Sequence, residues 1–262
     1  MYPDSIAGKV TDALGAKFGN APSFVASVEG CRARDAAAGV QLSINLPVAT
    51  APAQVAHANA WAQAVNEAEK ARAEGPSVLS LAALHPDCEG KPALVAQIAA
   101  AGFRGVKFHP EYQRFRFNDA KMDGVWEAMA DKGLVAYLHA GGERVFRPPY
   151  HSTPREIAEL KRRFPGLEIV AAHLGGFGMW DEAEELLCGS EVYLDLSHTF
   201  GWMDDAQILR MIRRHGAGRI LFGTDAPWQD PATVLQAFLK LPLDEASRRA
   251  ILHDNAVALF RL

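Results

Sequence analysis

The chain has 262 residues, of which 49% are hydrophobic and 22% are charged, so it is long enough to bury one large core. Its formal net charge of −4 excludes the strongly basic surface of a typical nucleic-acid-binding protein, and no apolar run approaches the length of a membrane span. The first residues lack the basic-then-apolar pattern of a signal peptide. Three distant cysteines, Cys31, Cys88 and Cys188, predict neither a disulfide framework nor a thiolate zinc site. We therefore expect a cytoplasmic protein whose thiols are reduced.

Apolar, strand-like segments alternate with helical segments along the chain. Two helices, at 4–18 and 27–38, precede the first strand, and an alanine-rich helix at 51–74 follows it. Thr153, Pro154 and Glu156 have the residue types and spacing of a helix N-terminus. The later helices are expected at 92–101, 119–132, 153–164, 181–187, 204–215, 231–239 and 244–262. The strands are expected at 41–47, 78–84, 105–109, 134–139, 168–173, 192–196 and 219–223.

The seven expected strands are apolar throughout rather than alternating, which indicates a parallel sheet covered on both faces. The length is close to the roughly 250 residues of a (β/α)₈ TIM barrel, and we expect a single domain over residues 1–262. A barrel of this kind needs eight strands, so we expect one that lacks its first strand, with the missing unit before Met1. An open, doubly wound sheet of seven strands is the alternative, although no strand is followed by the glycine fingerprint of dinucleotide-binding folds.

Polar side chains with metal-binding potential stand at or just past the carboxyl ends of six expected strands. In a parallel barrel these positions meet at one mouth. Neutral imidazoles and a carboxylate suit a divalent ion such as Zn²⁺, which lowers the pKa of a bound water to about 7. A nearby carboxylate can then move the proton. The six residues are His85, His109, His139, His173, His198 and Asp225.

His139, His173 and Asp225 are the strongest candidates of the six, because each ends a clear apolar strand. His109 either lines the pocket or turns the chain at Pro110. Several other residues have both a functional and a structural interpretation. Lys107 is either a carboxylated lysine that bridges two metal ions or part of a buried charge pair. Arg144 and Arg147 either bind a substrate carboxylate or are charged residues at the rim, and three aromatic residues either form a pocket wall or pack under loops: Tyr112, Trp180 and Trp228.

Four motifs resemble the amidohydrolase-related family, in the amidohydrolase 2 branch that includes aminocarboxymuconate-semialdehyde decarboxylase. They are Lys-Phe-His-Pro at 107–110, Leu-His-Ala-Gly at 138–141, Ala-His-Leu-Gly-Gly at 172–176 and Leu-Phe-Gly-Thr-Asp-Ala-Pro-Trp at 221–228. The resemblance implies a metal-dependent TIM barrel that acts on C–N, C–O or C–C bonds. It implies that His139 is a metal ligand, that His173 lies beside the metal-bound water as a further possible ligand, and that Asp225 is both a ligand and the proton-shuttling carboxylate.

The family's first strand ends in a His-x-His motif that supplies two metal ligands, and this sequence has no such motif. We expect Met1 to be an internal methionine, with the His-x-His strand upstream. If the chain begins at Met1, three possible ligands remain, namely His139, His173 and Asp225, and metal affinity should be poor.

The function expected from the resemblance is that of a metal-dependent hydrolase, in which metal-activated water attacks a small carbonyl-type substrate. Asp225 and His173 would be catalytic, while His109, Tyr112, Arg144 and Trp228 would bind the substrate. The cofactor would be one divalent ion, with Zn²⁺ preferred over Mn²⁺ or another ion. A decarboxylase of an unsaturated or aromatic acid is the first alternative, and a metal-free binding or structural barrel is the second. We expect a small-molecule substrate, no nucleic-acid or membrane partner, and a possible homo-oligomer.

Overall fold

The computed structural model describes all 262 residues and contains eight strand segments, each parallel to its neighbours. β2 and β3 are separated by Leu81 alone, and together they form one strand that pairs with β1 on one side and with β4 on the other. Seven strands therefore follow one another in chain order, as predicted. The segments are β1 (Leu42–Asn45), β2 (Ser77–Ser80), β3 (Ala82–Ala83), β4 (Gly105–Phe108), β5 (Val135–Leu138), β6 (Ile169–Ala171), β7 (Tyr193–Asp195) and β8 (Ile220–Leu221).

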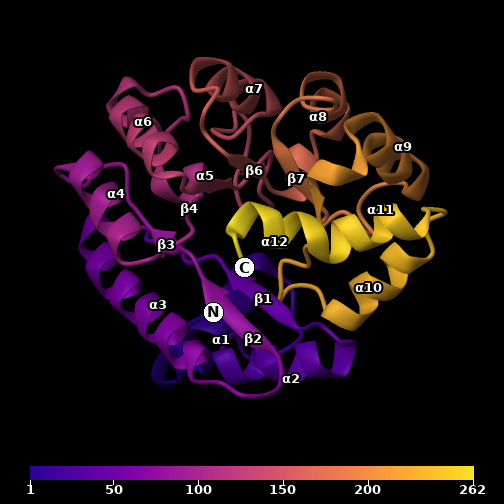
Figure 1. Ribbon diagram of the computed structural model, residues 1–262, viewed down its shortest axis with the longest axis horizontal. Helices are drawn as coiled ribbons and strands as arrows, with labels where there is room; N and C mark the ends of the chain where they lie inside the picture. The colour runs from indigo at the N-terminus through magenta and orange to yellow at the C-terminus, as the bar shows by residue number, and fades with distance from the viewer.

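Helices surround the strands on the outside, as Figure 1 shows. The α-helices are α1 (Asp4–Phe18), α2 (Val28–Ala38), α3 (Val55–Lys70), α4 (Lys91–Ala100), α5 (Pro110–Gln113), α6 (Asp123–Lys132), α7 (Pro154–Arg163), α8 (Trp180–Leu186), α9 (Asp205–His215), α10 (Pro231–Leu239), α11 (Glu245–Arg249) and α12 (Asn255–Phe260). Short 3₁₀ turns lie at Pro52–Gln54, Ala120–Met122, His173–Gly175 and Ala217–Arg219, and a π-helical turn lies at Ala250–Asp254. None of the helices has the length and hydrophobicity that a membrane crossing requires.

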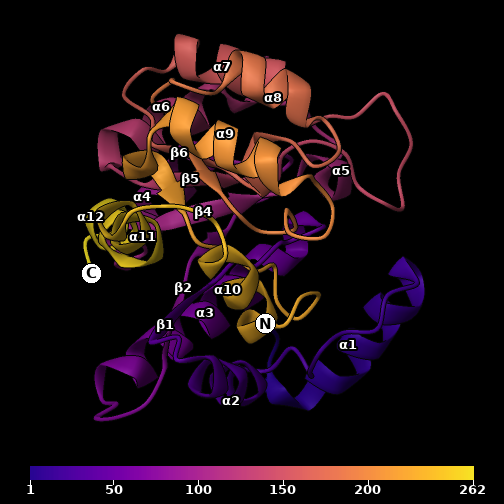
Figure 2. The ribbon, with the colours of Figure 1, turned by 90° about the vertical axis from the view of Figure 1, so that its right-hand side faces the viewer.

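The helix boundaries follow local capping chemistry. The Thr153 hydroxyl accepts a hydrogen bond from the Glu156 backbone N–H at 3.3 Å, so the predicted N-terminus of α7 is confirmed. The helix predicted over 51–74 is shorter, since it opens with a 3₁₀ turn and ends at Lys70. The short helix α5, directly after His109, was not predicted. Figure 2 shows α1 in indigo, lying along the outside and away from β4–β6.

The ring of strands is open between β1 and β8, which have no strand partner on their outer edges. A groove of about 800 Å³ lies there, lined on one side by residues such as Ile44 and on the other by residues such as Leu221. The C-terminal segment covers part of the β8 edge: the Phe222 N–H donates to the Ile251 carbonyl at 2.9 Å, and the Asn255 side chain donates to the Ile220 carbonyl at 2.7 Å. The strand order and the gap are those expected for a barrel that lacks one strand.

Two hydrophobic clusters explain why the strands are apolar throughout. The larger cluster lies between the strands and the outer helices, and includes Ala136 and Leu138 of β5. The smaller cluster lies on the opposite face of the strands and includes Val135 and Tyr137 of the same strand. Alternate residues of β5 thus face opposite sides and both are buried, as expected for a strand covered on both faces. This rigid wall fixes the strand ends that carry the candidate site residues.

Candidate active site

The strand-end residues lie where the sequence placed them. His109 follows β4 directly, His139 follows β5, and His173 follows β6 after one residue. His198 and Asp225 lie further along the loops after β7 and β8. His173, His198 and Asp225 have left-handed backbones with φ of 59°, 51° and 55°, which costs a non-glycine residue roughly 1–2 kcal/mol. Such strain at three neighbouring strand ends is typical of functional sites.

His85 does not take part in this arrangement. Its Nδ1 accepts a hydrogen bond from the Asp87 backbone N–H at 3.2 Å, and this bond lies in the turn after β3. His198 pairs with Asp225, with its Nδ1 2.8 Å from Asp225 Oδ2, and its ring also packs edge-on against His173 at 6.0 Å. The other five predicted positions therefore form a buried group around His139 and a pair, His198 and Asp225, that adjoins this group at His173.

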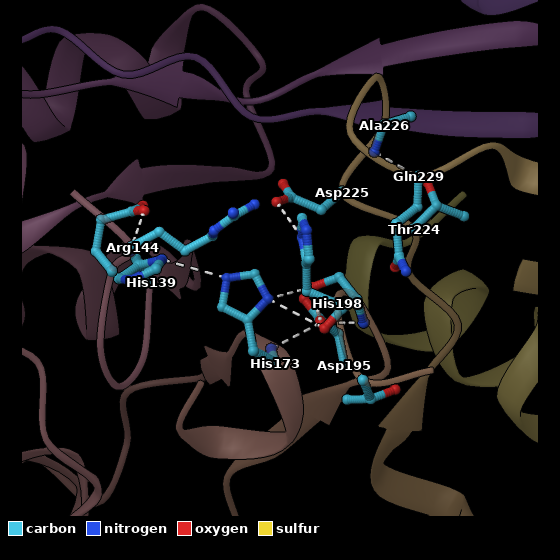
Figure 3. A network of polar contacts seen from close by, with 12 residues as sticks. His139, Arg144, His173, Asp195, His198, Thr224, Asp225, Ala226 and Gln229 are labelled. Atoms are coloured by element: carbon cyan, nitrogen blue, oxygen red, sulfur yellow. Dashed lines mark hydrogen bonds and ion pairs between the residues drawn. The ribbon is translucent and has the colours of Figure 1, made fainter. Parts of the chain in front are cut away.

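His139 and His173 follow the neighbouring strands β5 and β6, and their rings lie side by side in Figure 3. The distance from His139 Nδ1 to His173 Nε2 is 3.2 Å. The other nitrogen of each ring meets a backbone carbonyl: His139 Nε2 lies 3.0 Å from the Gly142 oxygen, and His173 Nδ1 lies 3.1 Å from the Ser197 oxygen. Because a carbonyl can only accept, those two nitrogens must carry the hydrogens.

Both imidazoles are neutral at physiological pH. Burial lowers the pKa of His139 well below its ordinary value, and the neighbouring titratable groups of His109, His173 and Lys107 lower it further. Burial also lowers the pKa of His173, although the negative charge of Asp225 acts in the opposite direction. A neutral imidazole has a single N–H, so the two facing nitrogens both present lone pairs.

This donor set fits a divalent cation. Two nitrogens bound to a tetrahedral Zn²⁺ at 2.0–2.1 Å lie about 3.3 Å apart, close to the 3.2 Å found between His139 and His173. Metal-binding histidines also donate their second N–H to carbonyls or carboxylates, as both rings do here. Two lone pairs that face each other without a shared proton repel, so a cation between them relieves the repulsion.

Asp225 lies on the more open side of the mouth, with 42% of its side chain exposed. Desolvation raises its pKa, but the hydrogen bond and charge of His198 outweigh this effect and hold the pKa below its usual range. Asp225 is therefore ionised at neutral pH. Its Oδ2 faces His198, which leaves Oδ1 without a protein partner.

A second cluster of ligand-type side chains shares His139. His109, His139 and Glu143 form the one group of three such residues whose ligand atoms all lie within 4.8 Å of one another. The rings of His109 and His139 stack at 3.9 Å, and His109 Nε2 lies 3.6 Å from Glu143 Oε2. The sequence analysis missed Glu143, although its position four residues after His139, beyond Gly141 and Gly142, could have suggested it.

Asp195 and Ser197 are further site residues that the sequence analysis missed. Asp195 ends β7, and its carboxylate accepts hydrogen bonds from the backbone N–H groups of His173 at 3.0 Å and Ser197 at 2.8 Å. Its only local signal is a charged residue within an apolar strand. Lys107 lies nearby inside the barrel, with its amine 5.0 Å from the centre of the Tyr137 ring. Burial lowers the pKa of Lys107, while the charges of Asp195 and Asp225 raise it.

The candidate substrate-binding residues lie around this centre. Tyr112 packs edge-on against His109 at 4.3 Å, and its buried hydroxyl has no protein partner. Trp228 is connected to it through Phe18 of α1, whose ring contacts both. Figure 3 shows the Arg144 side chain running past His139 toward Asp225. The groove of about 800 Å³ is not lined by His109, Tyr112, Arg144 or Trp228, and their substrate-binding roles stay predictions.

An aromatic wall borders His173 on the side of Arg144. The guanidinium carbon of Arg144 lies 5.3 Å from the Trp202 ring centre, and Trp202 packs against Phe177 at 5.5 Å and His198 at 5.9 Å. Trp180 contacts Phe177 and donates from its indole N–H to the His173 carbonyl at 3.0 Å. The wall is suited to a flat or aromatic ligand, with a cation at its edge.

Comparison with known proteins assigns the chain to a protein family. A family model described as Amidohydrolase matches residues 25–262. No curated protein matches. Similar solved structures include an uncharacterised TIM-barrel protein from Bordetella bronchiseptica, with a TM-score of 0.79 at 19% identity, over 99% of this chain and 95% of that one. The overall fold is therefore that of a TIM barrel.

Two further similar structures are decarboxylases. One is 5-carboxyvanillate decarboxylase from Sphingomonas paucimobilis, with a TM-score of 0.72 at 19% identity, over 91% of this chain and 84% of that one. The other is a dihydroxybenzoic acid decarboxylase from Polaromonas sp. JS666 with bound manganese and the inhibitor 2-nitroresorcinol, with a TM-score of 0.70 at 20% identity, over 98% of this chain and 92% of that one.

Proposed function

Since the chain belongs to the amidohydrolase family, we propose that it is a metal-dependent hydrolase acting on a small, carbonyl-type substrate at the mouth of its barrel. The observation that carries this proposal is the facing pair of imidazole lone pairs, 3.2 Å apart, on His139 and His173. His139 and His173 would hold one divalent ion, and Asp225 would be the third ligand, although its carboxylate does not lie within 4.8 Å of both rings in the structure. Zn²⁺ is the preferred ion because imidazole nitrogens suit it, although a similar structure holds manganese.

When bound, the ion would supply Lewis acidity to the substrate carbonyl and lower the pKa of water. Asp225 provides the proton transfer, because its Oδ1 is free while His198 holds Oδ2. Its lowered pKa keeps the carboxylate ionised before the reaction, and the substrate's leaving group receives the proton afterwards. His173, held neutral by burial, would act through the ion that its Nε2 lone pair holds, because its single N–H is already donated to Ser197.

His109, Tyr112, Arg144 and Trp228 would position the substrate. The unpartnered hydroxyl of Tyr112 can hydrogen-bond a polar group of the substrate beside His109. The guanidinium of Arg144 can hold a carboxylate, and the neighbouring Trp202 can stack on a planar part of the same molecule. The favoured substrate is therefore small, partly planar and anionic.

Decarboxylation of an aromatic or unsaturated acid is the second candidate, and the Arg144–Trp202 contact specifically favours it. That reaction needs a clamp for the carboxylate and a flat surface for the ring, and both lie beside His173. The decarboxylase structures to which the chain is similar support it by their chemistry, although at 19–20% identity they establish the fold alone.

One assay distinguishes the two candidates. Protein loaded with Zn²⁺ or Mn²⁺ is incubated with lactones and amides that carry a carboxylate, and separately with dihydroxybenzoic acids. Release of acid without CO₂ supports the hydrolase, whereas release of CO₂ supports the decarboxylase. Protein that binds neither ion would contradict both and favour a metal-free binding barrel. Asp225→Asn loaded with the ion at saturating concentration should be inactive if Asp225 moves the proton, and weaker binding of the ion by this variant would support its role as a ligand.

A further inference from the structure

A buried carboxylate that the proposed reaction does not use lies beside His173. Asp195 is 1% exposed and lines the interior of the barrel. Four donors reach it: the backbone N–H groups of His173 and Ser197, and the hydroxyls of Ser197 and Tyr137. Three of these donors reach Oδ1 and one, the Tyr137 hydroxyl, reaches Oδ2, so both oxygens of Asp195 are bound by groups of the protein. Its role is to hold other groups.

The Ser197 hydroxyl links Asp195 to the His173 ring. It donates its single proton to Asp195 Oδ1, so its oxygen can only accept from His173 Nδ1, which lies 2.9 Å away. The Ser197 carbonyl accepts from the same nitrogen at 3.1 Å. Both acceptors require the hydrogen of His173 to sit on Nδ1. The lone pair must then be on Nε2, the nitrogen that faces His139.

Without their neighbours, the two histidines would favour a different protonation state, in which one ring donates a hydrogen bond to the other. With its hydrogen on Nε2, His173 could donate a hydrogen bond to His139 Nδ1 across the 3.2 Å that separates them. That bond would replace two opposed lone pairs by an attractive contact and would close the site to a cation. Something must therefore hold the hydrogen on Nδ1, and the acceptors at Ser197 are the groups in contact with that nitrogen.

Asp195 also holds the backbone of His173. His173 and the following Leu174 both have left-handed backbones, with φ of 59° and 50°. The bond from the His173 N–H to Asp195 Oδ1, at 3.0 Å, helps to fix the first of these residues. The same oxygen accepts from the Ser197 N–H at 2.8 Å and so fixes the loop that carries the acceptors of the ring. One oxygen atom thus connects the backbone and the ring of His173.

We infer that Asp195 is a positioning residue that, through Ser197, keeps the hydrogen of His173 on Nδ1 and presents the Nε2 lone pair to a metal ion. The inference rests on the proposed function for the presence of the ion, but the protonation state of the ring can be tested without it. Removing a hydrogen bond that orients a metal-binding histidine typically lowers metal affinity 10–100-fold.

The test uses ¹⁵N NMR of the metal-free 262-residue chain, in which one-bond couplings identify the protonated ring nitrogen. The His173→Gln variant assigns the His173 signal among the nine histidines. In the wild type we expect the hydrogen on Nδ1. In Asp195→Ala the Ser197 hydroxyl loses its acceptor and can donate to Nδ1, while the Ser197 carbonyl still accepts from it, so we expect a larger share of the rings to carry the hydrogen on Nε2. Titration with Co²⁺ should show affinity about 10–100-fold weaker for this variant.

Two further variants separate positioning from general stabilisation. Asp195→Asn keeps an acceptor oxygen and should restore the Nδ1 hydrogen and most of the Co²⁺ affinity. Tyr137→Phe removes a bond to the other carboxylate oxygen, and should leave the His173 protonation state unchanged and the affinity within about threefold, since the bonds at Oδ1 stay. A folded Asp195→Ala variant with the wild-type protonation state and Co²⁺ affinity would overturn the inference.

If Asp195→Ala does not fold, the Ser197→Ala variant tests whether the link from Asp195 to His173 controls the protonation state of the ring. It removes the hydroxyl between Asp195 and the ring and leaves the Ser197 carbonyl, so we expect a mixture of the two protonation states and about tenfold weaker Co²⁺ binding. Unchanged NMR signals and unchanged affinity would overturn the inference. A wild-type chain that binds no Co²⁺ would contradict the proposed function, while the NMR comparison of metal-free proteins would still decide the role of Asp195.

Discussion

On the side of the barrel formed by β4–β7, His139 and His173 are buried and both nitrogens of each ring have partners, whereas on the side formed by β8 and β1 the Asp225 side chain is 42% exposed. We call these the buried side and the open side. The buried side is backed by consecutive strand pairs, and the open side borders a groove of about 800 Å³. The same mouth therefore has one rigid wall and one wall that is less constrained.

The difference indicates that the two sides have different roles in the site. Groups whose orientation must be exact, such as imidazole lone pairs, lie where strand pairing and buried hydrogen bonds fix them. The group that must gain and lose a proton lies where one carboxylate oxygen is free. The predictions below test whether the two sides differ in stability, metal binding, pH response and substrate binding, in order of decreasing effect.

The largest difference should be in stability. Phe108 of β4 is completely buried and packs against Trp126 at 5.0 Å, so Phe108→Ala should lower the free energy of unfolding by about 3–5 kcal/mol. Leu42 of β1 is only partly buried beside the groove, so Leu42→Ala should cost about 1 kcal/mol. Urea unfolding of the two variants measures both values. Equal losses would show that the two sides are equally well packed.

Metal binding should depend more on the buried side than on His198. His139→Gln removes one of the two facing nitrogens and should weaken Zn²⁺ binding by at least about 100-fold. His198→Gln removes only the partner of Asp225, and should weaken it by about tenfold. Competition with a chelating indicator gives both affinities. If His198→Gln has the larger effect, the ion is held on the open side and the ligand set must be revised.

The free energy of unfolding should fall as the pH is lowered, because of the buried histidines on the buried side. Burial lowers the pKa of His109, His139 and His173, so these rings stay neutral in the folded chain while the unfolded chain takes up protons below about pH 6.5. Their contribution is complete above that pH and is lost as the pH falls toward the folded pKa values. Each ring should contribute a slope of up to about 1.4 kcal/mol per pH unit.

Urea unfolding of metal-free protein at pH 7.5 and 5.5 measures this slope. His139→Gln should reduce it relative to the wild type, which also contains the buried His85 and His215. Asp225→Asn should leave it unchanged, because the pKa of Asp225 is lowered and its contribution is lost only below the unfolded value near 4. A slope that responds to Asp225→Asn would place the titrating group on the open side.

The smallest predicted effect is on substrate binding. Arg144→Ala should raise KM about tenfold for a substrate with a carboxylate and change kcat little, since the guanidinium only holds the carboxylate. Arg162→Ala, on the outer surface of α7, is the matched control and should leave KM unchanged. An equal fall in kcat for Arg144→Ala would instead assign the arginine to the transition state.

The strand ends could be predicted from the sequence because their signals are local. His139 and His173 close apolar runs, and any parallel barrel brings such residues to one mouth. The pairing of Asp225 with His198 could not be predicted, because the two lie 27 residues apart and meet only through the left-handed backbone at both positions. The gap between β1 and β8 followed from counting strands.

Asp195 was missed for a different reason. A charged residue in an apolar strand is a visible signal, but its meaning depends on His173, Ser197 and Tyr137, which come from three other positions in the chain. Glu143 was missed because a loop residue shows no periodicity, and its approach to His109 depends on the path of the loop after β5. Sequence patterns locate groups at the ends of elements, whereas hydrogen-bond partners require the folded structure.

The most direct test of the account is the X-ray absorption spectrum of the chain loaded with one equivalent of Zn²⁺, compared with that of His139→Gln. We predict that the wild type retains the ion and shows scattering from two imidazole nitrogens at 2.0–2.1 Å, and that the variant shows one imidazole or no retained ion. A wild-type chain that retains no Zn²⁺, or whose Zn²⁺ spectrum is unchanged by His139→Gln, would contradict a metal site built on His139 and His173.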